Sequence, residues 1–274
     1  MEQTTNDAQA IYITEIGGRP YLINEPDNRI EFLDQRFYAT PSGGMVPSVT
    51  TILEMWPKGA QYYEWLKKHG KDADEIRDEA GRRGSRVHNI TEGYDRGIIQ
   101  DMRGPEGEPR YKMAEWAMFE RYLDFRRVVK PGILEIERRL VSDKLGTGGT
   151  LDRVLTIGDE VWIIDLKTSN AIYDHYHLQT AAYLDLLAEC DRMPAERVIN
   201  IRRGILHVNA ATKTYGRGEA IQGPGWKLEE SGRSYEEDLD LFYACQKLWH
   251  ATNRNTKPKN ISYQLSHNPN QTAQ

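Results

Sequence analysis

Two aspartates and one lysine stand out because each lies in a run of residues with strand character. Asp152 lies in the run 149–157, and Asp165 and Lys167 end the run 160–167. Side chains alternate between the two faces of a β-strand, so Asp165 and Lys167 share one face. Two carboxylates with open coordination positions suit Mg²⁺ or Mn²⁺, and an ammonium group beside them can hold a water molecule or stabilise charge developing on a phosphate. This set of residues suits metal-assisted hydrolysis.

The spacing of the two runs predicts how the aspartates meet. Residues 158–159, Gly-Asp, fit a two-residue hairpin loop. If Ile157 pairs with Glu160, the same register places Asp152 opposite Asp165. Facing residues in such a ladder have Cβ atoms roughly 4.5–5.5 Å apart, so the two charges would repel each other unless a divalent cation lay between them.

The alternative is that both aspartates are surface residues of an exposed sheet face. The apolar run that precedes Asp165, Val-Trp-Ile-Ile, is typical of a central strand that is buried on both faces. Buried charges need partners, so this run favours a shared site over a solvated surface.

The surrounding elements must bring these strands together. In chain order, we expect strands at 11–16, 20–25, 29–34 and 36–39, a helix that opens at 47–50, mostly helical chain over 59–98, a helix over 109–129, strands at 133–142, 149–157 and 160–167, a helix over 174–190, a strand at 198–209 and a helix over 234–253. The order helix, three strands, helix, strand indicates an α/β core. We expect 1–46 to be an N-terminal β segment packed on the core, 47–254 to be the main domain, and 255–274 to be a disordered polar tail.

Composition sets the limits. The chain has 274 residues, which suits one elaborated domain or two small ones. No apolar run approaches the roughly 20 residues of a bilayer span, and the polar N-terminus is unlike a secretory signal, so we expect a cytoplasmic protein without membrane contact. Two cysteines exclude a disulfide scaffold and a four-cysteine iron–sulfur cluster. The net charge of −5 argues against broad coating of nucleic acid, although a local basic stripe would suffice for an enzyme.

Several motifs occur in an order that resembles the PD-(D/E)XK nuclease superfamily, and within it the RecB-like and phage-exonuclease branch. They are the segments 47–53 (PSVTTIL), 84–88 (GSRVH), 149–152 (GTLD), 164–169 (IDLKTS) and 178–183 (LQTAAY). Together they cover about residues 47–209. One departure is Leu151, which replaces the proline that usually precedes the first aspartate.

The resemblance implies a restriction-endonuclease-like core and a divalent metal. Asp152 and Asp165 would be metal ligands, joined by the main-chain carbonyl of Leu166 and by His88. Lys167 would position or activate the attacking water. The expected cofactor is Mg²⁺, for which Mn²⁺ would substitute.

Further residues receive roles from the same resemblance. Gln179 and Tyr183, four residues apart on one helix face, would contact the substrate phosphate or support the lysine; the alternative is that they cap a polar edge of the sheet. Glu137 matches an acidic position of the family, or is an ordinary strand charge. We expect His175 and His177 to be turn and surface residues.

DNA contact needs basic groups near the site. Arg82, Arg83 and Arg86 are the best candidates because they share the predicted helix with the histidine. Aromatic residues could stack on bases, but the spacing of Tyr62 and Trp65 favours packing in the core.

The implied activity is that of a metal-dependent DNA nuclease. An exonuclease of phage or recombination and repair type is favoured. An endonuclease, an enzyme acting on RNA and a non-catalytic DNA-binding or recombination scaffold remain alternatives. The implied partners are DNA, a recombination or single-strand-annealing protein, and further copies of the chain in a homo-oligomer. The implied location is the cytoplasm of a bacterial or phage-infected cell.

Overall fold

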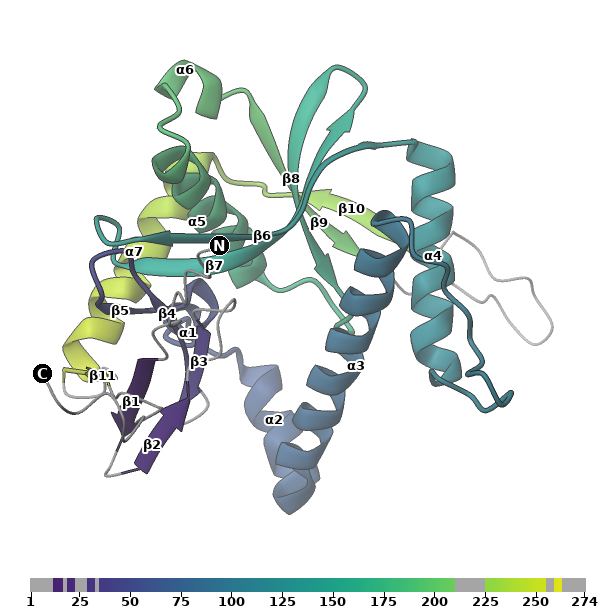
Figure 1. Cartoon of the computed structure of the whole chain (residues 1–274), viewed down its shortest axis with the longest axis horizontal. Coiled ribbons are helices and arrows are strands. Elements are labelled where there is room, and N and C mark those ends of the chain that lie inside the picture. Colours follow the sequence, from purple (N-terminus) through teal and green to yellow (C-terminus); the bar gives the residue numbers. More distant parts are fainter. Residues whose placement is uncertain are drawn as a thin grey trace, which may run out of the picture.

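A mixed five-strand sheet forms the centre of the molecule (Figure 1). The computed structural model describes residues 12–16, 19–22, 29–32, 35–209, 225–254 and 259–262. The strand order is β10-β9-β8-β7-β6, with bounds β6 Gly132–Ser142, β7 Thr147–Ile157, β8 Glu160–Lys167, β9 Ile201–His207 and β10 Lys227–Glu230. Strands β6, β7 and β8 form an antiparallel meander, and β9 lies parallel to β8. The predicted α/β fold class is confirmed.

Helices cover both faces of this sheet. On one face, helix α5 (Asp174–Cys190) connects β8 to β9 and packs against α7 (Tyr235–Thr252) and α1 (Val49–Leu53). On the other face lie α3 (Ala73–Asp95) and α4 (Met113–Val129). Strand β8 contributes side chains to both cores: Ile163 packs in the core under α5, and Trp162 and Ile164 pack in the core under α4. The sheet is therefore buried on both faces at β8, as its apolar run predicts.

This alternation decides where the polar residues of the strands point. Asp165 and Lys167 share the parity of Ile163 and so face the α5 side. Arg153 on β7 shares the parity of Leu155, which belongs to the core under α4. Asp165 and Lys167 therefore point to one side of the sheet and Arg153 to the other.

Several helix boundaries differ from the predicted ones for local reasons. The helical stretch 59–98 is divided at Gly70, whose φ of 52° ends α2 (Ala60–His69) and leads through a 3₁₀ turn, η1 (Gly70–Asp72), into α3. Helix α4 begins at Met113 rather than near 109, because Pro109 instead pairs with Arg103 in an isolated bridge. A short helix, α6 (Ala195–Val198), includes the first residue of the predicted strand 198–209, and the observed strand begins only at Ile201. Strand β10 was not predicted.

The N-terminal β segment forms two small sheets. The bounds are β1 Tyr12–Ile16, β2 Arg19–Leu22, β3 Arg29–Phe32, β4 Gln35–Ala39 and β5 Met45–Pro47. Phe37 of β4 is buried in the main core, with its ring 6.0 Å from that of Trp249 on α7. Within the predicted polar tail, β11 (Lys259–Ser262) pairs antiparallel with β1; residues 255–258 and 263–274 lie outside the described residues.

Candidate active site

Three acidic residues meet across three neighbouring strands. The β7–β8 ladder pairs Arg153 with Ile164, which is the register predicted from the hairpin, so Asp152 comes opposite Asp165. The β6–β7 ladder likewise brings Glu137 opposite Asp152. Both aspartates are buried. Such a concentration of negative charge in a poorly solvated place needs cations.

Glu137 has an unusual backbone. Its φ is 49°, in the left-handed region that non-glycine residues rarely adopt. The carboxylate accepts a hydrogen bond of 3.0 Å from Arg153 Nη1 and lies 3.9 Å from His88 Nδ1. Strain of this kind is typical of functional sites, so the backbone favours a site role for Glu137, which stays a prediction.

His88 reaches the acids from α3, on the far side of β7 and β8. Its Nδ1 lies 3.6 Å from Asp152 Oδ2, and its Nε2 lies 3.1 Å from the main-chain carbonyl oxygen of Leu166. His88, Glu137 and Asp152 each offer a ligand atom, and these atoms lie within 4.8 Å of one another. The structure thus brings together the predicted histidine and the first aspartate, and adds Glu137, while Asp165 lies beyond this closest group.

Two glycines allow helices to approach the strand ends. Gly84 lies one turn before the histidine on α3, and a Cβ atom there would lie 3.3 Å from the Thr168 hydroxyl after β8. Gly149 on β7 lies directly beneath the ring of Tyr183, which a Cβ would meet at 2.4 Å. Both predicted motif glycines are therefore needed for close packing around the site.

The charges in the site shift one another's proton affinities. Burial raises the pKa of Asp152, and burial together with Asp152 raises that of Asp165 to about 6, against the lowering effect of Lys167. Burial lowers the pKa of His88, but the carboxylates of Asp152 and Glu137 outweigh it and bring the pKa to about 9. The acids therefore favour a protonated imidazole, and His88 would have to release the proton from the nitrogen that takes a metal.

The donor set fits a divalent cation. Carboxylate oxygens, a carbonyl oxygen and one imidazole nitrogen are ligands that Mg²⁺ and Mn²⁺ accept. Burial is the main cause of the raised pKa of both aspartates, and neighbouring carboxylates add to it, so a cation bound between them would favour their charged form. Asp152 is held for this role, because the Leu166 backbone N–H donates to its Oδ2 at 2.7 Å.

The lysine belongs to a chain of contacts on the α5 side. Lys167 Nζ lies 2.7 Å from Asp165 Oδ2 and donates to Gln179 Oε1 at 2.9 Å. The Gln179 amide in turn donates to the Tyr183 hydroxyl at 3.0 Å. Gln179 thus contacts the lysine directly and Tyr183 contacts it through Gln179, and both side chains are buried. Their roles stay predictions.

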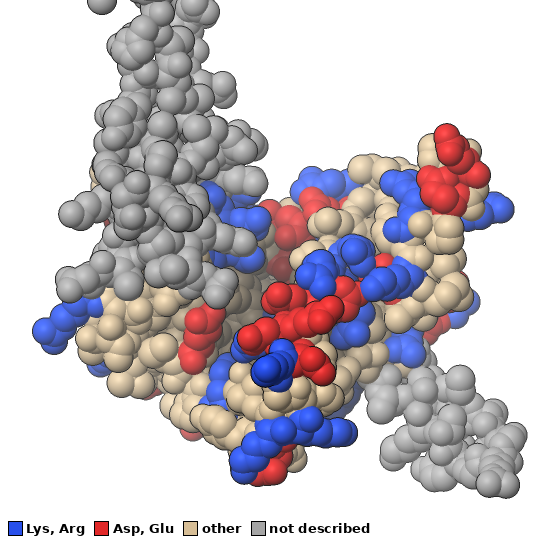
Figure 2. Space-filling model, turned by 90° about the horizontal axis from the view of Figure 1, so that it is seen from below, with Lys and Arg blue, Asp and Glu red and all other residues tan. Residues whose placement is uncertain are grey.

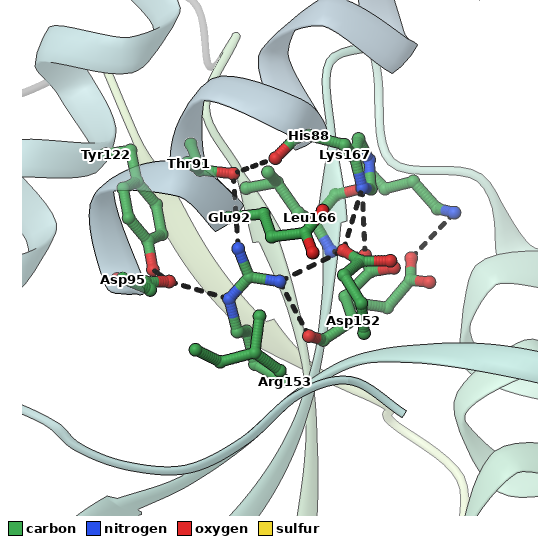
Figure 3. A network of polar contacts seen from close by, with 12 residues as sticks. His88, Thr91, Glu92, Asp95, Tyr122, Asp152, Arg153, Leu166 and Lys167 are labelled. Carbon is green, nitrogen blue, oxygen red and sulfur yellow. Dashed lines mark hydrogen bonds and ion pairs between the residues drawn. The ribbon is translucent and has the colours of Figure 1, made fainter. Parts of the chain in front are cut away.

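Sequence reasoning missed the support behind the acids, which Figure 3 shows. Arg153 is buried, and its Nε donates to Asp95 Oδ2 at 2.7 Å while its Nη1 reaches Glu137 and the Asp152 carbonyl. Tyr122 of α4 also donates to Asp95, at 2.5 Å. An arginine in an apolar strand next to a candidate ligand was the available signal, since a buried guanidinium requires an acid.

The three predicted DNA-contacting arginines lie in different surroundings. Arg86 forms an ion pair of 2.7 Å with Glu115, which is buried, so this arginine has a structural role. Arg82 pairs with Glu79 at the surface. Arg83 Nε is buried and has no hydrogen-bond partner among the described residues. The surface around α2 and α3, seen from below in Figure 2, carries acidic and basic side chains intermixed. DNA contact by these arginines stays a prediction.

Two predictions about neighbouring residues are wrong. His177 is buried, with its Nε2 3.7 Å from Glu229, and is not a surface residue. Tyr62 and Trp65 are not core residues, because α2, all of whose residues are described, contains no buried side chain.

A mixed sheet whose central strands bring acids and a lysine together is the architecture of a metal-dependent nuclease. A family model of the PD-(D/E)XK nuclease superfamily matches residues 59–265, and the chain belongs to that superfamily. Nucleases of this family use divalent metals and act on DNA. No significant match is found among curated proteins. Among the described residues, no helix is both long and apolar enough to cross a membrane.

Proposed function

We propose that the protein is a Mg²⁺-dependent deoxyribonuclease that degrades DNA from an end. The observation that carries this proposal is the position of Lys167, which is held between Asp165 and Gln179 beside the acids and the histidine. A non-catalytic scaffold has no need to bury an ammonium group next to several carboxylates, since each buried charge costs free energy.

The proposed mechanism divides the work among the side chains. His88, Asp152, Asp165 and the Leu166 carbonyl would hold the metal, and Glu137 lies close enough to join them. A divalent metal, when bound, lowers the pKa of water and neutralises charge on phosphate oxygens.

Lys167 would orient the attacking water in line with the phosphorus atom. Burial lowers the pKa of its ammonium, but Asp165 and Asp152 outweigh this and raise the pKa, so the ammonium form is favoured beside these carboxylates. Gln179, tied to Tyr183, fixes the direction in which the ammonium points.

The motif resemblance supports exonuclease activity, membership of the RecB-like branch and a role in phage recombination or repair. The contact of His88 with the Leu166 carbonyl is the part of this resemblance that the structure lets us see. The same resemblance supports a cytoplasmic location, a recombination or annealing protein as partner, and assembly into a homo-oligomer. An endonuclease is the second outcome that the experiment below distinguishes.

Digestion of matched substrates tests the proposal. Linear, nicked and closed circular DNA are incubated with Mg²⁺, with EDTA as the control. We expect degradation of the linear DNA and no cutting of closed circles; cutting of closed circles would show an endonuclease, and no cutting of any substrate would refute the nuclease.

Lys167→Ala tests the residue that carries the proposal. We expect its rate to fall by about 10²–10³, the usual cost of losing a charge-stabilising group, while calorimetry shows that metal still binds. Lys144→Ala is the matched control, because this lysine is exposed and pairs only with Glu189 in the described structure. Full activity of Lys167→Ala would refute the assignment.

A further inference from the structure

Helix α2 presents a series of aromatic rings outside the core. Tyr62 and Trp65 stack with ring centroids 6.1 Å apart and planes 25° apart, and Trp65 also lies 5.2 Å from the His69 ring. Tyr63 is 52% exposed. The helix lies beside the first half of α3, below the sheet in Figure 1, and Arg77 of α3 donates to the Tyr62 hydroxyl at 3.2 Å.

A second aromatic group lies at the start of α5, next to the proposed catalytic lysine. Tyr173 is 48% exposed, and its ring is stacked on that of His175, with centroids 5.9 Å apart and planes 14° apart. His175 in turn contacts Tyr176, with centroids 4.6 Å apart. Lys167 Nζ lies 4.5 Å from the centre of the Tyr176 ring. These rings therefore lead from the site to the surface.

Lys58 lies beside the first group, and its charge acts on His175 of the second. Its Nζ lies 5.9 Å from the centre of the Tyr62 ring. Burial lowers the pKa of His175 to about 4, and the charges of Lys58 and Lys167 contribute, so this ring is neutral at neutral pH. We call the set of Lys58, Tyr62, Trp65, Tyr173, His175 and Tyr176 the aromatic track.

Lysines outnumber acids along α2 and its flanks. Over residues 58–71 the chain has four lysines (Lys58, Lys67, Lys68 and Lys71) and a single acid, Glu64, although the whole chain has a net charge of −5. The first acid of α3, Asp74, is paired with Arg77. The rest of that half of α3 is acidic, with Glu75, Asp78 and Glu79 following, so the surplus of lysines is confined to α2 and its flanks.

From this arrangement we propose that the aromatic track holds unpaired nucleotides of a DNA strand and leads them to the active site. The inference rests on the proposed nuclease function and adds the form of DNA that the site receives. In a duplex the faces of the bases are hidden in the stack, whereas unpaired bases stack on protruding rings. Rings of this kind, with lysines beside them, suit a single strand better than a double helix.

Binding measurements on paired variants test the proposal. Fluorescence anisotropy is recorded in EDTA buffer, so that no strand is cut, with single-stranded and blunt duplex DNA of equal length. We expect Tyr173→Leu and Trp65→Leu each to weaken single-strand binding about tenfold, as expected for one lost base–ring contact, and to change duplex binding less than twofold. Tyr173→Phe and Trp65→Phe keep an aromatic ring and should retain the single-strand affinity.

Tyr94→Leu is the matched control, because Tyr94 is similarly exposed but packs on Phe119 away from the track. Circular dichroism of each variant shows whether it is folded. If the leucine variants bind single strands as tightly as the wild type, the rings only pack α2 on α3 and the inference is wrong, although the nuclease can stand. If the wild type neither binds nor cuts DNA, the proposed function itself fails.

Discussion

The two halves of α3 carry similar residues in opposite surroundings. In the second half, Asp95 has a fully buried carboxylate that is contacted by Arg153, Arg126 and Tyr122. In the first half, Asp74 pairs with Arg77 while the two side chains are 80% and 53% exposed. The same kind of ion pair is thus enclosed by protein at one end of the helix and surrounded by water at the other.

This difference separates a part that fixes geometry from a part that is free to meet substrate. A buried charge that loses its partner is left without water to replace it, whereas an exposed one is solvated again at little cost. The buried half carries His88 and Asp95. Arg153 binds Asp95 and also donates to Glu137 and to the Asp152 carbonyl, so it ties this half of α3 to the acidic site. The exposed half lies beside the aromatic track. Changes in the two halves should therefore have unequal effects on stability.

The largest loss is expected for Arg153→Met. This change removes one of the two arginines that neutralise the Asp95 carboxylate, and it removes the hydrogen bond that Arg153 donates to Glu137. We expect the free energy of unfolding to fall by about 3 kcal/mol, at the low end of the range for a broken buried pair because Arg126 still contacts Asp95. Urea denaturation measures this.

A double-mutant cycle then isolates the pair. Asp95→Asn combined with Arg153→Met should cost clearly less than the sum of the two single changes, because the first removes the charge that the second leaves unpaired. Strict additivity would show that the two side chains do not act as one unit.

A smaller loss is expected for Tyr122→Phe. The change removes one hydroxyl, which donates to the buried Asp95 carboxylate at 2.5 Å, and leaves the packing of the ring in place. We expect a loss of about 1–3 kcal/mol, the range for a buried polar group that loses one partner. Tyr94→Phe is the control, and thermal unfolding of the two variants compares them. A loss no larger than that of the control would contradict the account of the buried half.

The part of the site that the sequence predicts is the part defined by local rules. A two-residue hairpin loop fixes the β7–β8 register, so the meeting of Asp152 and Asp165 follows from counting residues. Helix α5 has the predicted bounds because clear apolar periodicity defines it. Strand alternation also places Lys167 beside Asp165, whereas His88 needed the family motifs, since no local rule brings α3 onto the end of β8.

The rest depends on contacts between distant parts of the chain. Arg153 meets Asp95 from 58 residues away, and no spacing rule selects that partner among the other acids. Strand β10 is four residues with the sequence KLEE, which has no alternation to indicate a strand. For Tyr62 and Trp65 the spacing correctly shows that they share a face of α2, but it does not show whether another element covers that face.

The smallest effect is expected for Asp74→Ala in the exposed half of α3. This acid contacts Arg77 three residues later, and both side chains are mostly in water. We expect the free energy of unfolding to change by less than about 0.5 kcal/mol, which urea denaturation in low salt can resolve. Moderate salt should remove most of the change because it screens exposed pairs. A loss as large as that of Tyr122→Phe would mean that the first half of α3 is held by its ion pairs as firmly as the second, and that it is not free to adjust to a DNA strand.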